Sequence, residues 1–148
     1  MLVAVFNEQQ DLAIDPQQVI TLVKHVFEVE DRKADEVSIH FVDKQTISQL
    51  HLDYFDDPTP TDCITFPQDT SEMENYCLLG DVFVCPKVAD EYSQENTCDK
   101  MEETSLYVVH GLLHLFGYDD IEEDDERKMR AAETKHIESL KKAGKLLG

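Results

Sequence analysis

A long apolar helix in the C-terminal half constrains the fold of this chain more than any other feature. The pattern predicts it from about Thr97 to Phe116, because hydrophobic side chains recur at helical spacing over a wide arc: Met101, Val108, Val109, Leu112, Leu113 and Phe116. Such a helix must be covered on several sides, so we expect it at the centre of the core. Gly117 ends it, since glycine readily adopts the left-handed conformation that closes a helix.

Strand and helix signals alternate over the rest of the chain. Short apolar runs predict four strands: the amino terminus, 37–41, 63–66 and 78–85. Helical spacing predicts three further helices: one that begins at Asp15-Pro16, one over 47–54 and one from about Glu122 to Lys142. Helical crossovers join two strand pairs, so part of the sheet should be parallel. We expect an α/β (α+β) fold with a mixed sheet of about four strands against several helices.

Nothing in the sequence divides the chain into parts. Its 148 residues suit one ordinary domain, and no repeat, low-complexity segment or linker interrupts them, so we expect a single domain over residues 1–148. The amino terminus lacks the cationic leader and long apolar stretch of a signal peptide. No window approaches the length of a membrane span. These patterns predict a cytoplasmic protein without a membrane segment.

The charge balance limits the partners that this chain can bind. Thirty-two acidic against 13 basic residues give a formal net charge of −19, which repels phosphate backbones and attracts cations or basic proteins. Composition alone therefore argues against a nucleic-acid-binding protein. Because no C-x-x-C pair occurs, we expect neither disulfides nor a thiolate zinc cluster from the four cysteines: Cys63, Cys77, Cys85 and Cys98.

Two histidines on the central helix carry the chemistry. His110 and His114 stand four residues apart, so their imidazoles project from one helical face and can reach a single ion. Zinc accepts imidazole nitrogens in a tetrahedral arrangement, which two histidines fill only halfway. After Gly117 the chain can double back, so a side chain from 118–120 can supply the third ligand. The spacing predicts one zinc ion per chain, held by His110, His114 and Asp120.

Each of these assignments has a structural alternative. Two histidines on an apolar helix could be core residues, although burial would leave both imidazoles in need of partners. Asp120 also opens the sequence D-I-E-E, which fits a capping box for the last helix. The remaining histidines are scattered, and we expect them to be surface or core residues: His25, His40, His51 and His136.

The same spacing matches the zinc-ligand pattern of the metzincin peptidases. Those enzymes carry a glutamate general base directly after the first histidine, and this chain has Gly111 there. The comparison therefore supports metal binding and argues against a peptidase.

The segment HGLLHLFGYDD resembles the signature of the YbeY family of bacterial rRNA maturation endoribonucleases. LHLDYFDDPTPTDCITFP is similar to the family segment that ends in P-T-D-V-L-S-F-P, and LLGDVFVC to its L-G-D-I-V-I strand. The total length is also typical, so the resemblance covers nearly the whole chain. It implies a zincin-like mixed α/β fold, a metal held by three side chains, and hydrolysis of single-stranded RNA in 16S rRNA 3′-end maturation and ribosome quality control.

The resemblance also assigns residues. His110 and His114 match the first two histidine ligands of the family, and Asp120 stands where most members have a third histidine. Carboxylate is an acceptable zinc ligand, so this implies a site of two histidines and one carboxylate. Phe55 occupies a position where the family usually has arginine, a natural phosphate clamp. Phenylalanine lacks that charge but can stack on an unpaired base.

We therefore expect a metal-dependent endoribonuclease whose partners are rRNA or the small ribosomal subunit. A basic small-subunit ribosomal protein and an assembly GTPase are further expected partners. The general base stays open between Asp119, Asp120, a second water and the RNA itself. The alternative is a ribosome-assembly binding factor with a structural metal and little catalysis, which the charge of −19 and Phe55 favour.

Overall fold

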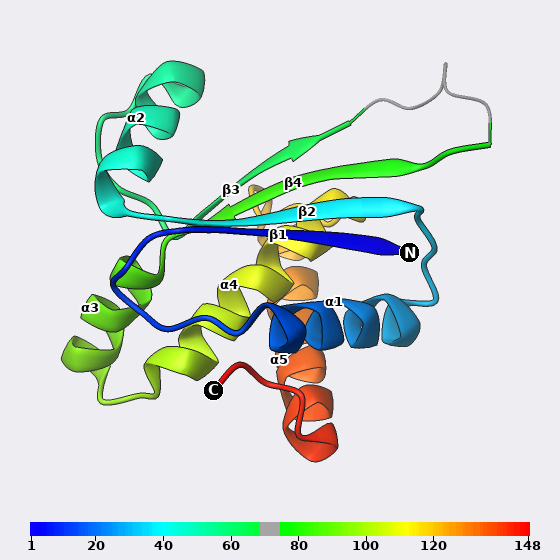
Figure 1. The fold of residues 1–148 in the computed structure, drawn as a ribbon. Coiled ribbons are helices and arrows are strands. Elements are labelled where there is room, and N and C mark those ends of the chain that lie inside the picture. The colour runs from blue at the N-terminus through cyan, green and yellow to red at the C-terminus, as the bar shows by residue number, and fades with distance from the viewer. Residues whose placement is uncertain (69–74) are drawn as a thin grey trace.

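A four-stranded sheet with helices on both sides forms the framework of the computed structural model, which describes residues 1–68 and 75–148 (Figure 1). The elements follow in the order β1 (Leu2–Glu8), α1 (Pro16–Glu30), β2 (Glu36–Val42), α2 (Lys44–Phe55), β3 (Cys63–Pro67), β4 (Leu78–Val84), α3 (Pro86–Asn96), α4 (Lys100–Leu115) and α5 (Glu123–Ala143). The predicted mixed sheet of about four strands with several helices is confirmed.

The sheet has the strand order β1-β2-β4-β3. Strands β1, β2 and β4 run parallel, with Val5 opposite Ile39 and Ile39 opposite Val82. Strand β3 pairs antiparallel with β4 and forms the edge of the sheet. The parallel part that the crossovers predicted is thus the set β1, β2 and β4, and the edge strand β3 makes the sheet mixed.

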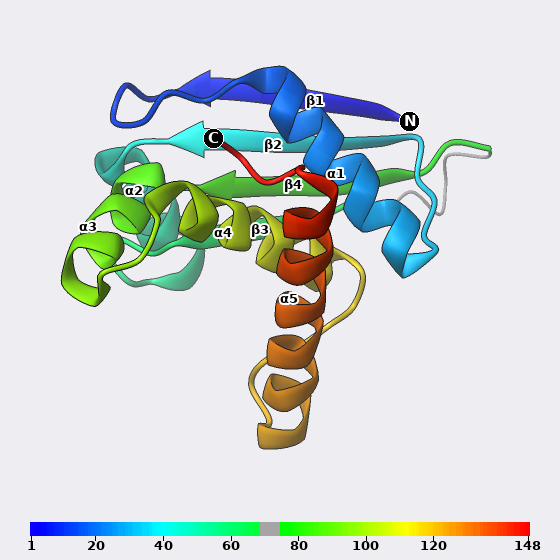
Figure 2. The same cartoon turned by 90° about the horizontal axis from the view of Figure 1, so that it is seen from below.

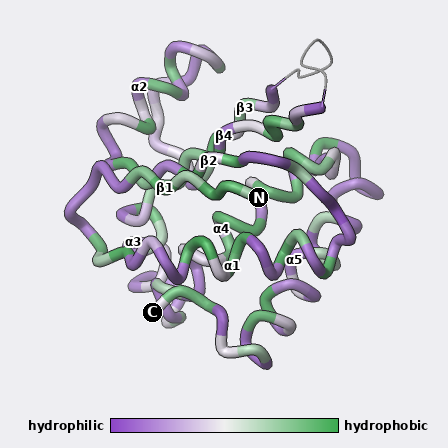
Figure 3. Tube along the Cα trace, turned by 45° about the vertical axis from the view of Figure 1, so that its right-hand side comes forward, coloured by the Kyte–Doolittle hydropathy of each residue, from purple (hydrophilic) through white to green (hydrophobic). Residues whose placement is uncertain are grey.

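Helix α4 lies in the middle of the layer that covers one face of the sheet. Figure 2 shows α1, α4 and α5 in front of the strands, and Figure 1 shows α2 on the opposite side. Four apolar side chains of α4 are fully buried, which confirms its predicted central position: Val108, Val109, Leu112 and Leu113. In Figure 3 the hydrophobic stretches gather where α4 meets the strands. Among the described residues, no helix is both long and apolar enough to cross a bilayer.

The segment before α4 differs from the prediction. Thr97 does not begin the long helix but ends α3 in the left-handed conformation, with φ of 52°. Helix α4 begins at Lys100, because Asp99 accepts a hydrogen bond from the backbone N–H of Met101 and so caps the helix. The sequence analysis missed α3, which buries only Pro86, Ala89 and Ser93 and so shows little apolar periodicity.

Gly111 lets α4 lie directly against the sheet. A Cβ atom at this position would come within 2.4 Å of Val82 Cγ1 on β4 and 2.9 Å of Cys63 Sγ on β3. Both separations are shorter than van der Waals contact, so no larger side chain fits without movement of the strands. Position 111 therefore cannot hold the glutamate that the metzincin pattern would require.

We expect Gly111→Ala to destabilise the protein by about 1–3 kcal/mol, the usual cost of overpacking a core. Alanine favours a helix over glycine by about 1 kcal/mol, but the branched side chain of Val82 has few rotamers with which to avoid the new methyl group. Urea unfolding of both proteins measures the difference. The Val82→Ala background supplies the control, because removal of the Val82 methyl groups should relieve the shorter of the two contacts and make the two substitutions less than additive. Equal stability of Gly111→Ala and wild type would contradict the close contact.

Candidate metal centre

The three predicted ligands converge at the end of α4. The Nε2 atoms of His110 and His114 are 3.0 Å apart. Asp120 Oδ2 lies 3.6 Å from Nε2 of His110 and 3.5 Å from Nε2 of His114. A tetrahedral zinc ion bound at about 2.0–2.1 Å keeps neighbouring ligand atoms roughly 3.3 Å apart. The triangle of donor atoms fits one face of such a tetrahedron, so this group can bind a metal ion.

Hydrogen bonds at Nδ1 orient the imidazoles of His110 and His114 so that both Nε2 atoms point to the same place. His110 Nδ1 lies 2.6 Å from Glu133 Oε2, and His114 Nδ1 lies 3.1 Å from the carbonyl oxygen of Tyr118. Both partners accept, so in each neutral ring Nδ1 carries the proton and donates it. The two Nε2 lone pairs then face each other. A cation between them removes their mutual repulsion, which is a second sign that the donor set suits a metal.

The turn after α4 places Asp120 beside the histidines. Gly117 adopts a positive φ of 106°, which reverses the chain at the end of the helix. Asp119 is exposed, and its Oδ1 accepts hydrogen bonds from the backbone N–H groups of Asp120 and Ile121. Asp119 therefore shapes the turn, and Asp120 is the carboxylate that faces the imidazoles.

The capping-box alternative for Asp120 is not what the structure shows. Helix α5 begins at Glu123, with Glu122 in the N-cap position and no side-chain capping bond. Asp120 lies two residues before that cap and directs Oδ2 toward His110 and His114. A helix-capping role therefore does not explain this side chain.

Glu133 is a component of the centre that the sequence analysis missed. It lies on α5, is buried, and accepts hydrogen bonds from His110 and from Arg130 Nη1 at 2.8 and 3.0 Å. Burial opposes its ionisation, but the hydrogen bonds from His110 and Arg130 outweigh burial and lower the pKa of Glu133 below its usual value. An ionised carboxylate behind a ligand histidine fixes the ring and increases its basicity. The sequence did contain a signal for a buried Glu133, because helical spacing places position 133 on the same face of α5 as Met129 and His136.

A second buried group fixes the other side of the turn. The Tyr118 hydroxyl donates to both carboxylate oxygens of Glu30 at 3.2 and 3.1 Å. Glu30 Oε1 also lies 2.6 Å from Nε2 of His136, which is fully buried. Tyr118 supplies the carbonyl that orients His114, so α1 and α5 together hold the turn in place. His136 is a core residue, as expected.

A small cavity lies directly beside His110 and His114. It has a volume of about 240 Å³ and is lined by His51, Phe55, Thr61, Cys63, Ile64, Thr65, His110 and His114. Helix α2 and edge strand β3 therefore form its other walls. Burial raises the pKa of the Cys63 thiol well above its usual value, so Cys63 stays protonated and is a poor metal ligand.

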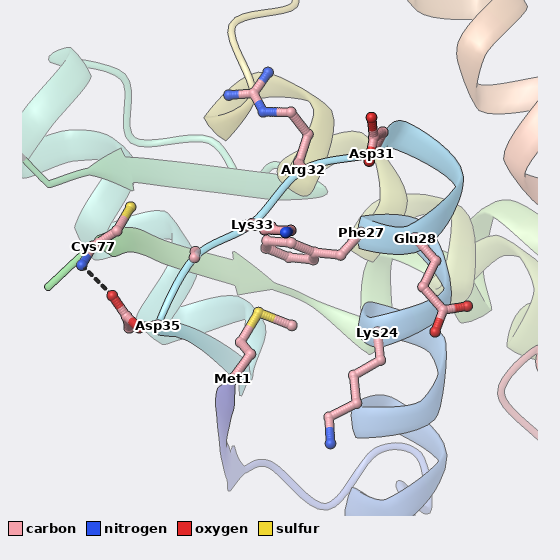
Figure 4. Close-up of a pocket in the computed structure, with 10 residues that line it drawn as sticks. Met1, Lys24, Phe27, Glu28, Asp31, Arg32, Lys33, Asp35 and Cys77 are labelled. Atoms are coloured by element: carbon pink, nitrogen blue, oxygen red, sulfur yellow. Dashed lines mark hydrogen bonds between the residues drawn. The ribbon is translucent and has the colours of Figure 1, made fainter. Parts of the chain in front are cut away.

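A larger cavity, of about 770 Å³, lies elsewhere and includes none of the three candidate ligands (Figure 4). Its lining contains three cationic and three acidic residues: Lys24, Arg32 and Lys33, and Glu28, Asp31 and Asp35. Asp35 accepts a hydrogen bond from the backbone N–H of Cys77, drawn as a dashed line in Figure 4. The positive and negative charges of this cavity lining balance, so the lining favours no class of ligand. The metal-binding residue types at His110, His114 and Asp120, rather than the size of a cavity, therefore identify the candidate site.

Known proteins match this chain over most of its length. A model of the family described as Endoribonuclease YbeY matches residues 4–141. Endoribonuclease YbeY of Protochlamydia amoebophila is 53% identical over 136 residues, which cover 92% of this chain and 91% of that protein. The protein of the same name from Chlamydia trachomatis serovar D is 42% identical and covers 86% of this chain and 80% of its own length.

The solved structures agree on the fold. A solution structure of a Thermotoga maritima protein superimposes with a TM-score of 0.64 at 23% identity, and the match covers 93% of this chain and 87% of that one. The resemblance inferred from the sequence motifs is thus confirmed by the family match and by the curated relatives. The chain belongs to the YbeY endoribonuclease family.

Proposed function

We propose that this chain, as one domain over residues 1–148, is a single-strand-specific, metal-dependent endoribonuclease that acts in 16S rRNA 3′-end maturation and ribosome quality control. One observation carries the proposal: three donor atoms lie 3.0–3.6 Å apart with a buried ionised carboxylate behind them, and two of the three donor residues, His110 and His114, line a cavity. Its relatives are named endoribonucleases, which supports RNA as the substrate.

The proposed metal is zinc, one ion per chain, held by His110, His114 and Asp120. When bound, zinc supplies an activated water and a positive charge for the scissile phosphate. Three protein ligands leave one tetrahedral position for water or substrate, as catalytic zinc sites require. Glu133 and the Tyr118 carbonyl keep the ligand imidazoles in the correct tautomer, and the adjacent cavity receives the RNA strand.

The proposed setting is the cytoplasm, with rRNA or the small ribosomal subunit as partner. A net charge of −19 repels free RNA, so a basic small-subunit ribosomal protein would help the chain to approach its substrate. An assembly GTPase is a further proposed partner. The second candidate function, a ribosome-assembly binding factor with a structural metal and little catalysis, is favoured by the same charge and by Phe55 in place of the usual arginine.

We expect about one zinc ion per chain in protein purified without added metal, measured by elemental analysis. His110→Ala and His114→Ala should each remove most of the zinc, because the remaining two side chains leave the ion poorly held. His25→Ala is the matched control. Its Nε2 bonds only to Ser139 among the described residues, so zinc content should stay unchanged. Protein that contains no zinc and takes up none at neutral pH would contradict the site.

Asp120→Asn should weaken zinc binding by about tenfold or more, because an amide oxygen replaces an anionic donor. Asp120 caps no helix in the structure, so the stability of the metal-free protein should change little. Asp120→His should retain zinc, since it supplies the third histidine usual in the family. Asp119→Asn is the control, because its amide oxygen can still accept the two turn hydrogen bonds. Competition with a chromogenic chelator measures all four proteins, and full affinity in Asp120→Asn would remove Asp120 from the ligand set.

Zinc-loaded protein should cleave an unstructured RNA that spans the 3′ end of 16S rRNA and should leave the same sequence intact when it is annealed to its complement. A chelator should stop cleavage, and His114→Ala should reduce it to background, because both remove the metal. Gel analysis of products on one preparation with measured zinc content tests this. Protein that carries zinc, binds small subunits and leaves RNA intact would favour the assembly factor instead.

A further inference from the structure

Phe55 presents an aromatic ring at the mouth of the metal centre. It is the last residue of α2, 57% of its surface is exposed, and it lines the cavity that also contacts His110 and His114. A phenylalanine left this exposed contributes little to the core, since the free energy of burial scales with the apolar area removed from water. Its position beside the ligands calls for a role other than packing.

The neighbouring aromatic rings on the open face of the sheet cannot offer the same surface. Phe6, His40 and Phe83 stack in a row, with centroids 4.7 and 4.2 Å apart and interplanar angles of 13° and 8°. The stack covers both faces of His40 and one face each of Phe6 and Phe83, and none of the three rings lines the cavity. Phe55 instead meets His51 at 5.8 Å and 58°, so the two rings do not stack flat and leave ring surface open to the cavity.

His51 is held in a fixed orientation as the second wall. Its Nδ1 donates to the carbonyl oxygen of Thr59 at 2.8 Å, and its position one helical turn before Phe55 places both rings on the same side of α2. The ring therefore cannot turn away when a ligand enters.

The cavity offers no lysine or arginine side chain for a phosphate. Its lining contains neither lysine nor arginine among the described residues, and the net charge of the chain is −19. Its volume of about 240 Å³ is smaller than the roughly 300–1,000 Å³ of pockets that enclose drug-sized ligands, so it suits a flat group of about one ring system. Stacking on aromatic rings is the interaction by which proteins hold unpaired bases without regard to charge.

We propose that Phe55, together with His51, holds one unpaired nucleobase of the RNA strand by stacking, next to the phosphate at the metal centre. The proposal rests on the proposed function, because it assumes that the strand passes His110 and His114. A base within a duplex has both faces covered by its neighbours and cannot occupy this position. The stacking site therefore gives the enzyme its preference for single strands.

A fluorescent base tests the contact directly. Zinc-loaded protein is titrated into a short 2′-O-methylated single-stranded RNA that carries one 2-aminopurine, whose emission falls when the base stacks, and a gel confirms that the strand stays intact. Wild type should quench the emission, and Phe55→Ala should weaken binding by about 5- to 100-fold, the loss typical of one stacked base. Phe55→Tyr should restore both quenching and affinity.

Tyr54→Ala is the matched control. Tyr54 is the adjacent residue of the same helix, is 65% exposed, and packs edge-on against Phe66 without lining the cavity. It should bind the probe as wild type does. Phe55→Arg, which introduces the residue usual in the family, should lose the quenching and steepen the dependence of log K on log salt by about 0.7, the effect of one phosphate contact on a single strand.

Equal affinity of Phe55→Ala and wild type, or an equal loss in Tyr54→Ala, would overturn the proposal. Its failure differs from failure of the nuclease function. Protein that cleaves RNA with the same KM in wild type and Phe55→Ala contradicts the stacking site alone. Protein that quenches the probe through Phe55 but never cleaves RNA contradicts the nuclease alone.

Discussion

The contact between α4 and the strands at Gly111 decides where the rest of the site lies. Because Gly111 has no side chain, Val82 and Cys63 approach the helix backbone directly, and His110 and His114 lie on the same helix beside this contact. Residues of α2 and of the edge strand β3 form the other walls of the cavity beside them. The same contact excludes the glutamate of a peptidase, so the chemistry open to the centre follows from its packing.

Two hydrogen-bonded glutamates, Glu133 in the core and the half-buried Glu30, are the second constraint, and each has its partners. Glu133 is ionised within the core because His110 and Arg130 donate to it, and Glu30 is held by Tyr118 and His136. An unpaired charge at either place would cost far more than the pair contributes. The main effect of the two carboxylates is therefore to fix the positions of their partners rather than to add stability. They tie the turn after α4 to α1 and α5.

The sequence alone predicted the features that depend on local periodicity. The spacing of apolar residues located α4 and the parallel strands, and the i, i+4 rule with Gly117 brought His110 and His114 together with a residue of the turn. Features that depend on contacts between distant segments escaped it. In the sequence, Glu133 looks like one more acidic residue of an acidic helix. Helix α3 buries too few apolar residues to show helical periodicity. The capping bond of Asp99 makes α4 begin later than the apolar pattern predicted. The cavity joins α2, β3 and α4, which no local pattern connects.

The three donor side chains all come from one short stretch of chain, from His110 to Asp120. Closing so short a loop costs little entropy, because that cost grows with the number of residues enclosed. A metal ion that binds this group would therefore have its three donor residues close along the chain even before the sheet is formed. A ligand that also binds the unfolded chain raises the free energy of unfolding only by the difference between its affinities for the two states. A metal ion bound at this group would stabilise the native state by less than the strength of its binding implies.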